Sequence, residues 1–261
     1  MNDSATAFWK TRAEKYEELQ WVKDDEFMDR FLDAAKLHPE DVVLDIGTGV
    51  GKVASAASPH VEKVVGIDIS LDMIGKAGNG EFLQQDVREL EFEDEAFDKV
   101  LARMVLHHVT DGIEKAVGEC YRVLKPGGIM VVGEGTPPIA ENGQYDMQDE
   151  ITAWYTEVFR IKEDRLTLYE HDIVDLMAGA GFREIRIDPY YIEGLSVQNW
   201  LESSGLSKDK QDQILQKIYW PPECVERALR LVRTKGDILI NSRYVIVSGR
   251  KPERLQCGRS R

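Results

Sequence analysis

The sequence has few of the features that mark secreted, membrane-spanning or nucleic-acid-binding proteins. It has only three cysteines, and their wide spacing indicates neither a disulfide framework nor a metal knuckle, so we expect a reducing, cytoplasmic compartment. No apolar stretch approaches the roughly 20 residues that cross a bilayer, and residues 1–15 lack a signal-peptide core. Basic residues number 33 against 47 acidic ones, a net charge of −14. This acidity disfavours nucleic acid or an anionic membrane as the partner.

The composition is that of a globular protein. Hydrophobic residues make up 43% and charged residues 31% of the 261 positions, which allows a substantial buried core. This length predicts one large domain, or one domain with an elaborated cap.

The most informative stretch, residues 41–51, reads DVVLDIGTGVG. An apolar run typical of a buried strand leads into glycines at three alternating positions. Glycine lets the backbone turn sharply and approach a ligand where a Cβ would clash. A second strand ends at Asp68, whose carboxylate can accept hydrogen bonds from both hydroxyls of a ribose. Together these segments predict the first half of a nucleotide-binding α/β unit.

The glycine spacing fails to match two phosphate-binding motifs. A dinucleotide fingerprint needs glycine at its sixth position, where this chain has Lys52. A P-loop needs Ser or Thr after its Gly-Lys pair and another glycine five positions before it. Val53 and Ile46 occupy those positions here. The spacing therefore favours a ligand without a phosphate, the alternative being a glycine-rich turn that binds nothing.

The remaining pattern alternates strands with helices. We expect strands over residues 42–46, 63–68, 81–84, 97–102, 129–134, 183–191 and 238–249. We expect helices over residues 5–37, 52–58, 71–77, 113–124, 149–159 and 173–180, with a further helical insertion near 196–235. Near-continuous apolar strands between helices predict a parallel sheet that is covered on both faces.

Several short motifs occur in the order and spacing of one enzyme family. They read LDIGTGVG at 44–51, GIDIS at 66–70, QD at 85–86, FD at 97–98, LHHV at 106–109 and RVLKPGG at 122–128. Over residues 41–134 the chain resembles the class I S-adenosylmethionine-dependent methyltransferases, in the small-molecule branch with the ubiquinone and menaquinone C-methyltransferases. The resemblance implies an α/β, Rossmann-like fold whose seven-stranded sheet is mostly parallel, with its last strand antiparallel. It weakens sharply after residue 138.

On this interpretation, residues 1–261 form a single methyltransferase domain. We expect an N-terminal helical lid at 1–38, a cofactor-binding core at 39–134, cap insertions at 135–172 and 195–236, and a disordered tail at 250–261. A monomer or a homodimer is expected.

The resemblance implies that the cofactor contacts lie at the carboxyl ends of the strands, where open α/β sheets bind ligands. Asp68 should hold the ribose diol, and Asp86 should meet the adenine edge, the alternative for each being a helix cap or turn residue. Tyr16 and Arg12 should close over the cofactor's carboxylate, unless their helix only packs on the sheet edge. The expected cofactor contacts are Tyr16, Asp45, Gly47, Thr48, Gly49, Asp68, Ile69, Met73, Asp86, Val87, Ala102 and Arg103.

The reaction is an in-line displacement, and a base is needed only where the nucleophile carries a proton that is hard to lose. His107 and His108 follow the fourth strand, and imidazole titrates near neutral pH. Glu134 ends the fifth strand at the same edge. We expect these three residues to be catalytic; one histidine could instead pack or cap a helix, and Glu134 could be a solvated carboxylate.

An aromatic segment beyond the fifth strand is the candidate acceptor site. Trp154, Tyr155 and Phe159 are expected to bind the substrate, although a plain hydrophobic helix face would have the same pattern. We expect no metal, because the other histidines lie at no ligand spacing.

We therefore interpret the chain as an enzyme that transfers a methyl group from S-adenosylmethionine, leaving S-adenosylhomocysteine, to a small aromatic or conjugated metabolite. The missing sixth glycine disfavours a dehydrogenase on the same scaffold. The alternatives are a non-catalytic S-adenosylmethionine-binding or regulatory module and a methyltransferase that acts on a macromolecule. The latter is disfavoured by the acidity and by the sequence ARMV at 102–105, where an Asn/Asp-Pro-Pro-Tyr motif would indicate amide or base nitrogens.

Overall fold

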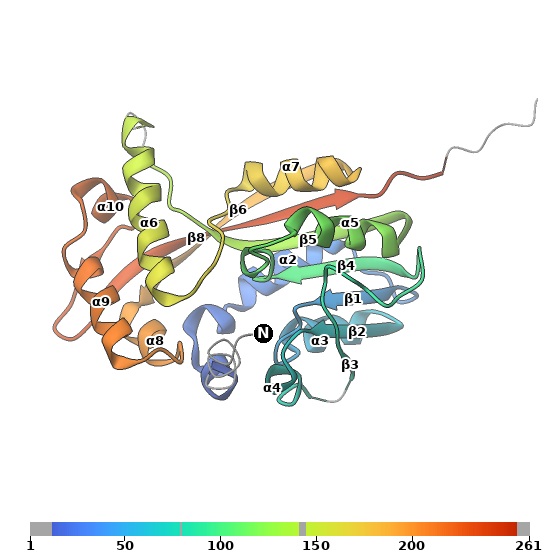
Figure 1. The fold of residues 1–261 in the computed structure, drawn as a ribbon, viewed down its shortest axis with the longest axis horizontal. Helices are drawn as coiled ribbons and strands as arrows, with labels where there is room; N and C mark the ends of the chain where they lie inside the picture. Colours follow the sequence, from blue (N-terminus) through green and yellow to red (C-terminus); the bar gives the residue numbers. More distant parts are fainter. Residues whose placement is uncertain (1–11, 79, 141–144, 255–261) are drawn as a thin grey trace, which may run out of the picture.

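The computed structural model describes residues 12–78, 80–140 and 145–254 (Figure 1). Its strands are β1 (Val42–Ile46), β2 (Lys63–Asp68), β3 (Glu81–Gln84), β4 (Phe97–Arg103), β5 (Leu124–Thr136), β6 (Arg183–Ser196), β7 (Val232–Arg233) and β8 (Ile238–Arg250). They form one sheet in the order β3-β2-β1-β4-β5-β8-β6, with β7 beside β8. Strands β1 to β5 pair in parallel, whereas β8 runs antiparallel to β5 and β6. The predicted fold class is confirmed; the short β7 lies in a segment predicted to be helical.

The α-helices are α2 (Asp25–Ala35), α3 (Lys52–Ala57), α4 (Leu71–Ile74), α5 (Ile113–Val123), α6 (Gln148–Lys162), α7 (Glu170–Ala180), α8 (Val197–Glu202), α9 (Lys208–Tyr219) and α10 (Glu223–Ala228). The segment predicted to be helical over residues 5–37 is helical in most of its described part, but it is divided into short pieces. Short 3₁₀ turns at Tyr16–Glu18 and Gln20–Lys23 precede α2. The Asp24 carboxylate accepts the Phe27 N–H at 2.7 Å, so it caps a new helix. Residues 1–11 lie outside the described residues.

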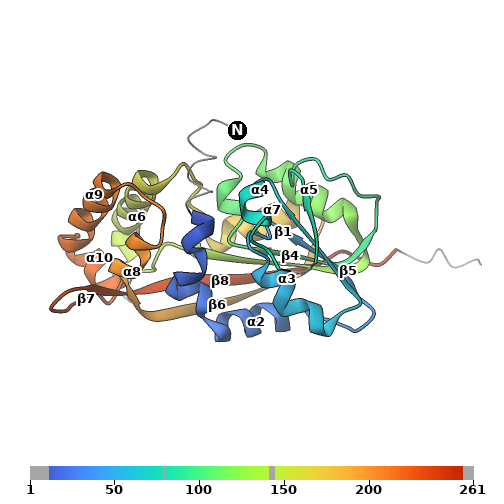
Figure 2. The ribbon, with the colours of Figure 1, turned by 90° about the horizontal axis from the view of Figure 1, so that it is seen from below.

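Adjacent residues of a strand point to opposite faces of the sheet, and this alternation builds two cores. The core under α5 and α7 contains apolar side chains from the central strands, including Leu44, Ile46, Val65, Ile67, Val100, Ala102, Met130, Val132, Val245 and Val247. The core under α2 and α3 takes Val43, Leu101, Val131 and Ile246. Figure 2 shows these two helix pairs on opposite sides of the sheet. The sheet is therefore covered on both faces, as its apolar strands predict.

A helical cap lies beyond one end of the sheet, where Figure 1 shows α6, α8, α9 and α10 together. The cap has its own apolar cluster, made of Val158, Val197, Leu201, Leu206, Ile214, Ile218 and Ile238. The strand β6 reaches this cap because it continues past its predicted end at Tyr191 to Ser196, paired with β8. Among the described helices, none is both long and apolar enough to cross a membrane.

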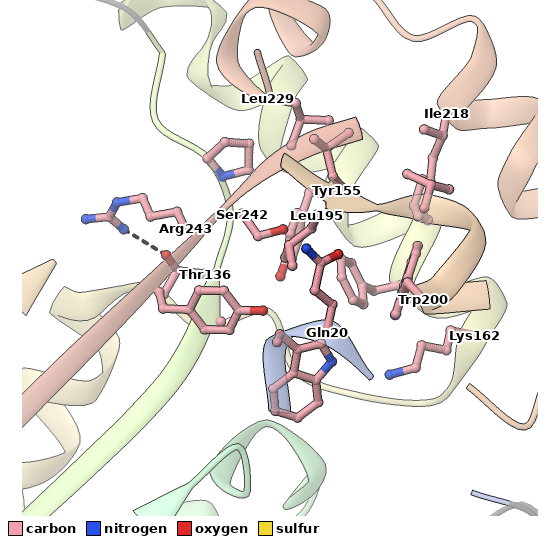
Figure 3. Close-up of a pocket in the computed structure, with 18 of the residues that line it drawn as sticks. Gln20, Thr136, Tyr155, Lys162, Leu195, Trp200, Ile218, Leu229, Ser242 and Arg243 are labelled. Atoms are coloured by element: carbon pink, nitrogen blue, oxygen red, sulfur yellow. Dashed lines mark hydrogen bonds between the residues drawn. The ribbon is translucent and has the colours of Figure 1, made fainter. Parts of the chain in front are cut away.

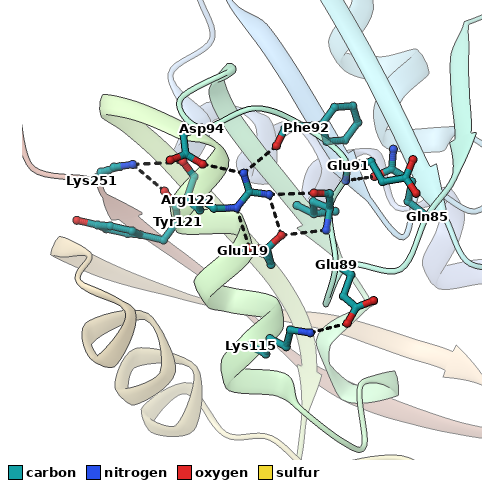
Figure 4. Close-up of polar contacts among 11 residues, drawn as sticks. Gln85, Glu89, Glu91, Phe92, Asp94, Lys115, Glu119, Tyr121, Arg122 and Lys251 are labelled. Carbon is teal, nitrogen blue, oxygen red and sulfur yellow. Dashed lines mark hydrogen bonds and ion pairs between the residues drawn. The ribbon is translucent and has the colours of Figure 1, made fainter.

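Arg122 fixes the loop after β3 that forms one wall of the site. Its guanidinium donates to the Leu90 and Phe92 carbonyls and pairs with Glu119 and Asp94 at 2.7–2.9 Å (Figure 4). Three partners in the loop and one on α5 hold this loop against the helix.

The tail is ordered further than predicted. Lys251 donates to the Leu124 carbonyl at 2.7 Å and to the Tyr121 carbonyl at 2.9 Å. Arg254 pairs with Glu95 at 2.6 Å. The expectation of disorder from residue 250 is thus wrong for these residues, and residues 255–261 lie outside the described part of the chain.

Candidate functional site

The glycine loop after β1 adopts a backbone that needs glycine. Gly47, Gly49 and Gly51 have φ of 60°, 57° and 78°, a left-handed region that other residues rarely adopt. A Cβ at Gly47 would lie 2.4 Å from Val105 Cγ2. The loop is tied to β2, because the Gly49 N–H donates to Asp68 Oδ2 at 2.9 Å. Glycine is therefore required here by both conformation and space.

Asp45 supports this loop from beneath. It accepts the Thr48 hydroxyl at 2.6 Å and the Ala54 N–H at 3.1 Å, and burial raises its pKa to about 7. Asp45 was expected to face the cofactor, but neither it, Thr48 nor Ala102 lines the adjoining pocket. Asp45 and Thr48 lie one layer deeper and shape the loop.

A pocket opens where β1, β2, β3 and β4 end, at the sheet edge predicted to bind the cofactor. Of the expected cofactor contacts it brings together Tyr16, Gly47, Gly49, Asp68, Ile69, Met73, Asp86, Val87 and Arg103. The Asp86 carboxylate is held by Arg88 at 2.6 Å, which lowers the Asp86 pKa.

Asp68 is the carboxylate best placed to accept hydroxyl groups. Its Oδ1 accepts the Ser70 N–H at 2.8 Å, and its Oδ2 accepts the Gly49 N–H. Each carboxylate oxygen keeps a further lone pair, and the side chain is only partly buried. Burial raises the Asp68 pKa, against the lowering effect of these N–H donors. Two fixed oxygens facing a pocket fit a vicinal diol.

His107 and Glu134 form a buried pair at the ends of β4 and β5. The His107 Nδ1 lies 2.5 Å from Glu134 Oε2, and the two side chains are 2% and 0% exposed. Glu134 Oε1 accepts the N–H groups of Val105 and Leu106 at 3.0 and 2.7 Å. Glu134 is therefore no solvated strand-end carboxylate, and it engages one nitrogen of His107 and leaves Nε2 for another partner.

The electrostatics of this site favour a neutral imidazole. Burial, and next the charge of Arg165, lower the His107 pKa well below its usual value. Burial raises the Glu134 pKa to about 7. A neutral imidazole is the form that accepts a proton.

The adjacent histidines face different pockets. His107 lines the pocket under the cap, and His108 lines the cofactor pocket. Burial also lowers the His108 pKa. Their ring centroids are 3.9 Å apart, so the two histidines lie where the two pockets adjoin.

Glu163, which sequence reasoning did not single out, lies beside both histidines. Ligand-type atoms of His107, His108 and Glu163 lie within 4.8 Å of one another, a grouping that sequence spacing did not predict. Three basic side chains surround Glu163, namely Arg12, Lys162 and Arg165. This positive charge opposes a divalent cation.

The pocket under the cap is lined by aromatic side chains. It brings together Trp154, Tyr155 and Phe159, the expected substrate contacts, with Trp21, Trp200 and Tyr244. Figure 3 shows Lys162 and Trp200 on one side of it, with Thr136 and Arg243 on the other. Arg12 and Met104 line both this pocket and the cofactor pocket. A ligand in the cap pocket would therefore border the cofactor site.

Comparison with known proteins agrees with this geometry. Residues 44–132 match the family described as "Methyltransferase domain". The uncharacterized methyltransferase YcgJ of Bacillus subtilis is 26% identical over 78% of this chain and 81% of its own length. The ubiquinone/menaquinone biosynthesis C-methyltransferase UbiE of Vibrio parahaemolyticus is 28% identical over 59% of this chain and 69% of its own.

The same relationship holds in three dimensions. The crystal structure of the Bacillus YcgJ protein has a TM-score of 0.75 at 22% identity, covering 87% of this chain and 98% of that one, which shows a shared fold. The family match, the named relatives and the glycine loop with its strand-end pocket agree. Residues 44–132 are thus a methyltransferase domain on a class I methyltransferase fold, and the protein is an S-adenosylmethionine-dependent methyltransferase whose cofactor is S-adenosylmethionine.

Proposed function

We propose that the protein methylates a small aromatic or conjugated molecule that binds in the cap pocket. The observation that carries this proposal is the aromatic lining of that pocket, including Trp154, Tyr155 and Phe159, next to the cofactor pocket. Aromatic walls around a few placed polar groups are typical of small-molecule sites. The curated relatives include enzymes named for ubiquinone and menaquinone biosynthesis, which supports a conjugated acceptor. The three widely spaced cysteines support a reducing, cytoplasmic compartment, and the net charge of −14 supports a small molecule over a nucleic acid as the acceptor.

The described residues fit the cofactor. The loop at Gly47 and Gly49 lets a ligand approach the backbone, and Asp68 offers two fixed oxygens to a ribose. When bound, S-adenosylmethionine supplies an electrophilic methyl group. The protein's part is to place the acceptor near attack distance, which can lower the barrier by roughly 7–11 kcal/mol.

We infer that His107 accepts the proton that the acceptor loses. When Glu134 is ionised, its Oε2 accepts the Nδ1–H of the ring, so Nε2 keeps its lone pair and would take the proton from a phenol or an acidic C–H group. His108, on the cofactor side, completes the wall between the pockets.

A transfer assay tests the proposed acceptor class. S-adenosylmethionine labelled in its methyl group would be incubated with phenols, quinols, aromatic amines and aromatic acids, and the products read by mass spectrometry. We expect label in at least one aromatic product. Label only in protein or RNA would overturn the proposal, as would S-adenosylhomocysteine binding without transfer to any member.

Asp68→Ala should weaken S-adenosylhomocysteine binding by at least about tenfold. A charged hydrogen bond contributes roughly 1.5–3 kcal/mol, and this carboxylate would make two to the ribose. Asp68 is a strand-end residue outside the apolar cores, so the fold should survive. Calorimetry measures the affinity. The matched control is Asp72→Ala, since Asp72 lies nearby in the first turn of α4 but does not line the pocket. Equal affinities for the two variants would show that Asp68 does not hold the cofactor.

A further inference from the structure

One guanidinium in the cap pocket has donor capacity that the protein does not use. Arg165 is 6% exposed and lines this pocket. Its Nε donates to the Leu166 carbonyl at 3.3 Å, whereas its Nη2 is buried with no hydrogen-bond partner among the described residues. A buried charged donor without a partner is costly and rare in folded proteins. An incoming acceptor atom would satisfy it.

The carboxylates near Arg165 do not pair with its Nη2. Glu163 Oε2 makes no hydrogen bond among the described residues, and its ion-pair contacts, at 3.8 and 3.9 Å, are with Arg12 and His108. Glu163 Oε1 lies 3.9 Å from Arg165 Nη1, beyond hydrogen-bond length, and it accepts Lys162 Nζ at 2.7 Å. Glu134 is taken by His107 and two backbone N–H groups. Neither carboxylate therefore meets the open side of the guanidinium.

Lys162 adds a second buried cation at the same wall. It is 5% exposed, and a single carboxylate, Glu163, serves both it and Arg165. Burial, and next the charge of Arg12, lower the Lys162 pKa to about 7. A bound anion would offset this crowding of positive charge.

The position of these cations separates them from the cofactor site. Arg165 and Lys162 line the cap pocket, and neither lines the cofactor pocket. Both lie over the Phe159 ring, with Arg165 Cζ at 4.6 Å and Lys162 Nζ at 5.9 Å from its centroid. Positive charge thus meets an aromatic wall inside the proposed acceptor site.

We propose that the acceptor is an aromatic acid whose carboxylate binds Arg165 and Lys162 while its ring packs against Phe159 and its aromatic neighbours. This inference rests on the proposed function, since it places the acceptor in the cap pocket. The planar guanidinium fork matches a carboxylate in geometry and charge. A single carboxylate suits one open guanidinium edge, and a phosphate dianion would need more donors.

Binding of matched probes tests the charge preference. Protein saturated with S-adenosylhomocysteine would be titrated with benzoate, benzamide and phenyl phosphate by calorimetry. We expect benzoate to bind at least about tenfold more tightly than benzamide, because a charge-assisted pair is lost in the amide. Equal affinities, or no binding by benzoate, would overturn the proposal. Tighter binding of phenyl phosphate would overturn the choice of a carboxylate.

Substitutions at Arg165 and Lys162 test whether these two side chains bind the carboxylate. Arg165→Gln and Lys162→Gln should each weaken benzoate binding about tenfold or more and leave benzamide unchanged, with Arg165→Lys recovering part of the loss. The control is Arg160→Gln, an arginine on the same helix as Lys162 that does not line the cap pocket, which should change nothing. If Arg165→Gln does not fold, Lys162→Gln decides the question. Benzoate binding that neither variant alters would overturn the assignment.

The transfer assay distinguishes this proposal from the broader one. Transfer to aromatic acids, but not to their amides or esters, supports both. Transfer to neutral aromatics with no preference for acids would keep the proposed function and overturn the anionic acceptor.

Discussion

Glu134→Gln is expected to lower the single-turnover rate of methyl transfer by about 10²–10⁴-fold, the range for loss of a general base. The amide oxygen of the substituted side chain can replace Oε1 as the acceptor for the two backbone N–H groups now bound there. The new NH₂ group then faces His107 Nδ1, which must become the acceptor. The ring would carry its proton on Nε2, with no lone pair for the substrate.

Several measurements separate this effect from damage to the fold. S-adenosylhomocysteine affinity should stay within about threefold of the parent, because Glu134 does not line the cofactor pocket. His107→Gln should lose a similar amount of activity, since it removes the same base. His108→Gln should lose less, since His108 lines the other pocket.

The pH dependence gives a second test. Burial and the charge of Arg165 lower the His107 pKa well below its usual value, so the imidazole itself stays neutral near pH 7. Burial raises the Glu134 pKa to about 7, and a protonated Glu134 would donate to Nδ1 and leave the ring proton on Nε2. The parent rate should therefore fall as pH drops through about 7, and this acid limb should vanish in His107→Gln. If Glu134→Gln and His107→Gln both turn over like the parent, the pair is structural and positioning alone accounts for catalysis.

The α/β core could be predicted because its signals are local. Strand positions follow from short apolar runs, and the glycine loop follows from its spacing, so β1, β2 and β4 lie where the sequence places them. The pairing of His107 with Glu134 also has a local origin, because both follow neighbouring parallel strands. Asp24, an acidic residue that starts a new helix, was a usable signal for the break in the N-terminal segment.

The charged residues beside the cap pocket could not be predicted in the same way. Lys162, Glu163 and Arg165 come at the end of α6 and just after it, and no spacing relates them to the histidines near residue 107. They meet because the cap folds back over the sheet, where the Leu166 N–H donates to the His107 carbonyl at 2.8 Å. In sequence, these three residues look like a solvated charge run at the end of a helix. Only tertiary packing buries them.

Gly47→Ala is expected to be the most destabilising of the substitutions considered, with a loss of about 2–5 kcal/mol in the free energy of unfolding. A left-handed φ costs a non-glycine residue roughly 1–2 kcal/mol, and overpacking adds about 1–3 kcal/mol. The new Cβ would lie 2.4 Å from Val105 Cγ2 and 2.8 Å from Cγ1. Val105 is stiff because it is β-branched, and its N–H is held by Glu134, so it cannot easily retreat.

The matched control is Gly118→Ala within α5. A Cβ there meets nothing within 4 Å, and alanine is favoured over glycine in a helix by roughly 0.5–1 kcal/mol, so this variant should be slightly more stable than the parent. Urea unfolding with and without S-adenosylhomocysteine measures both variants. Gly47→Ala should also lose most of the stabilisation by the ligand, because the displaced loop lines the cofactor pocket. An unfolding free energy within about 0.5 kcal/mol of the parent would contradict this prediction. It would mean that the Val105 side chain can move away from the new Cβ although its N–H is bound to Glu134.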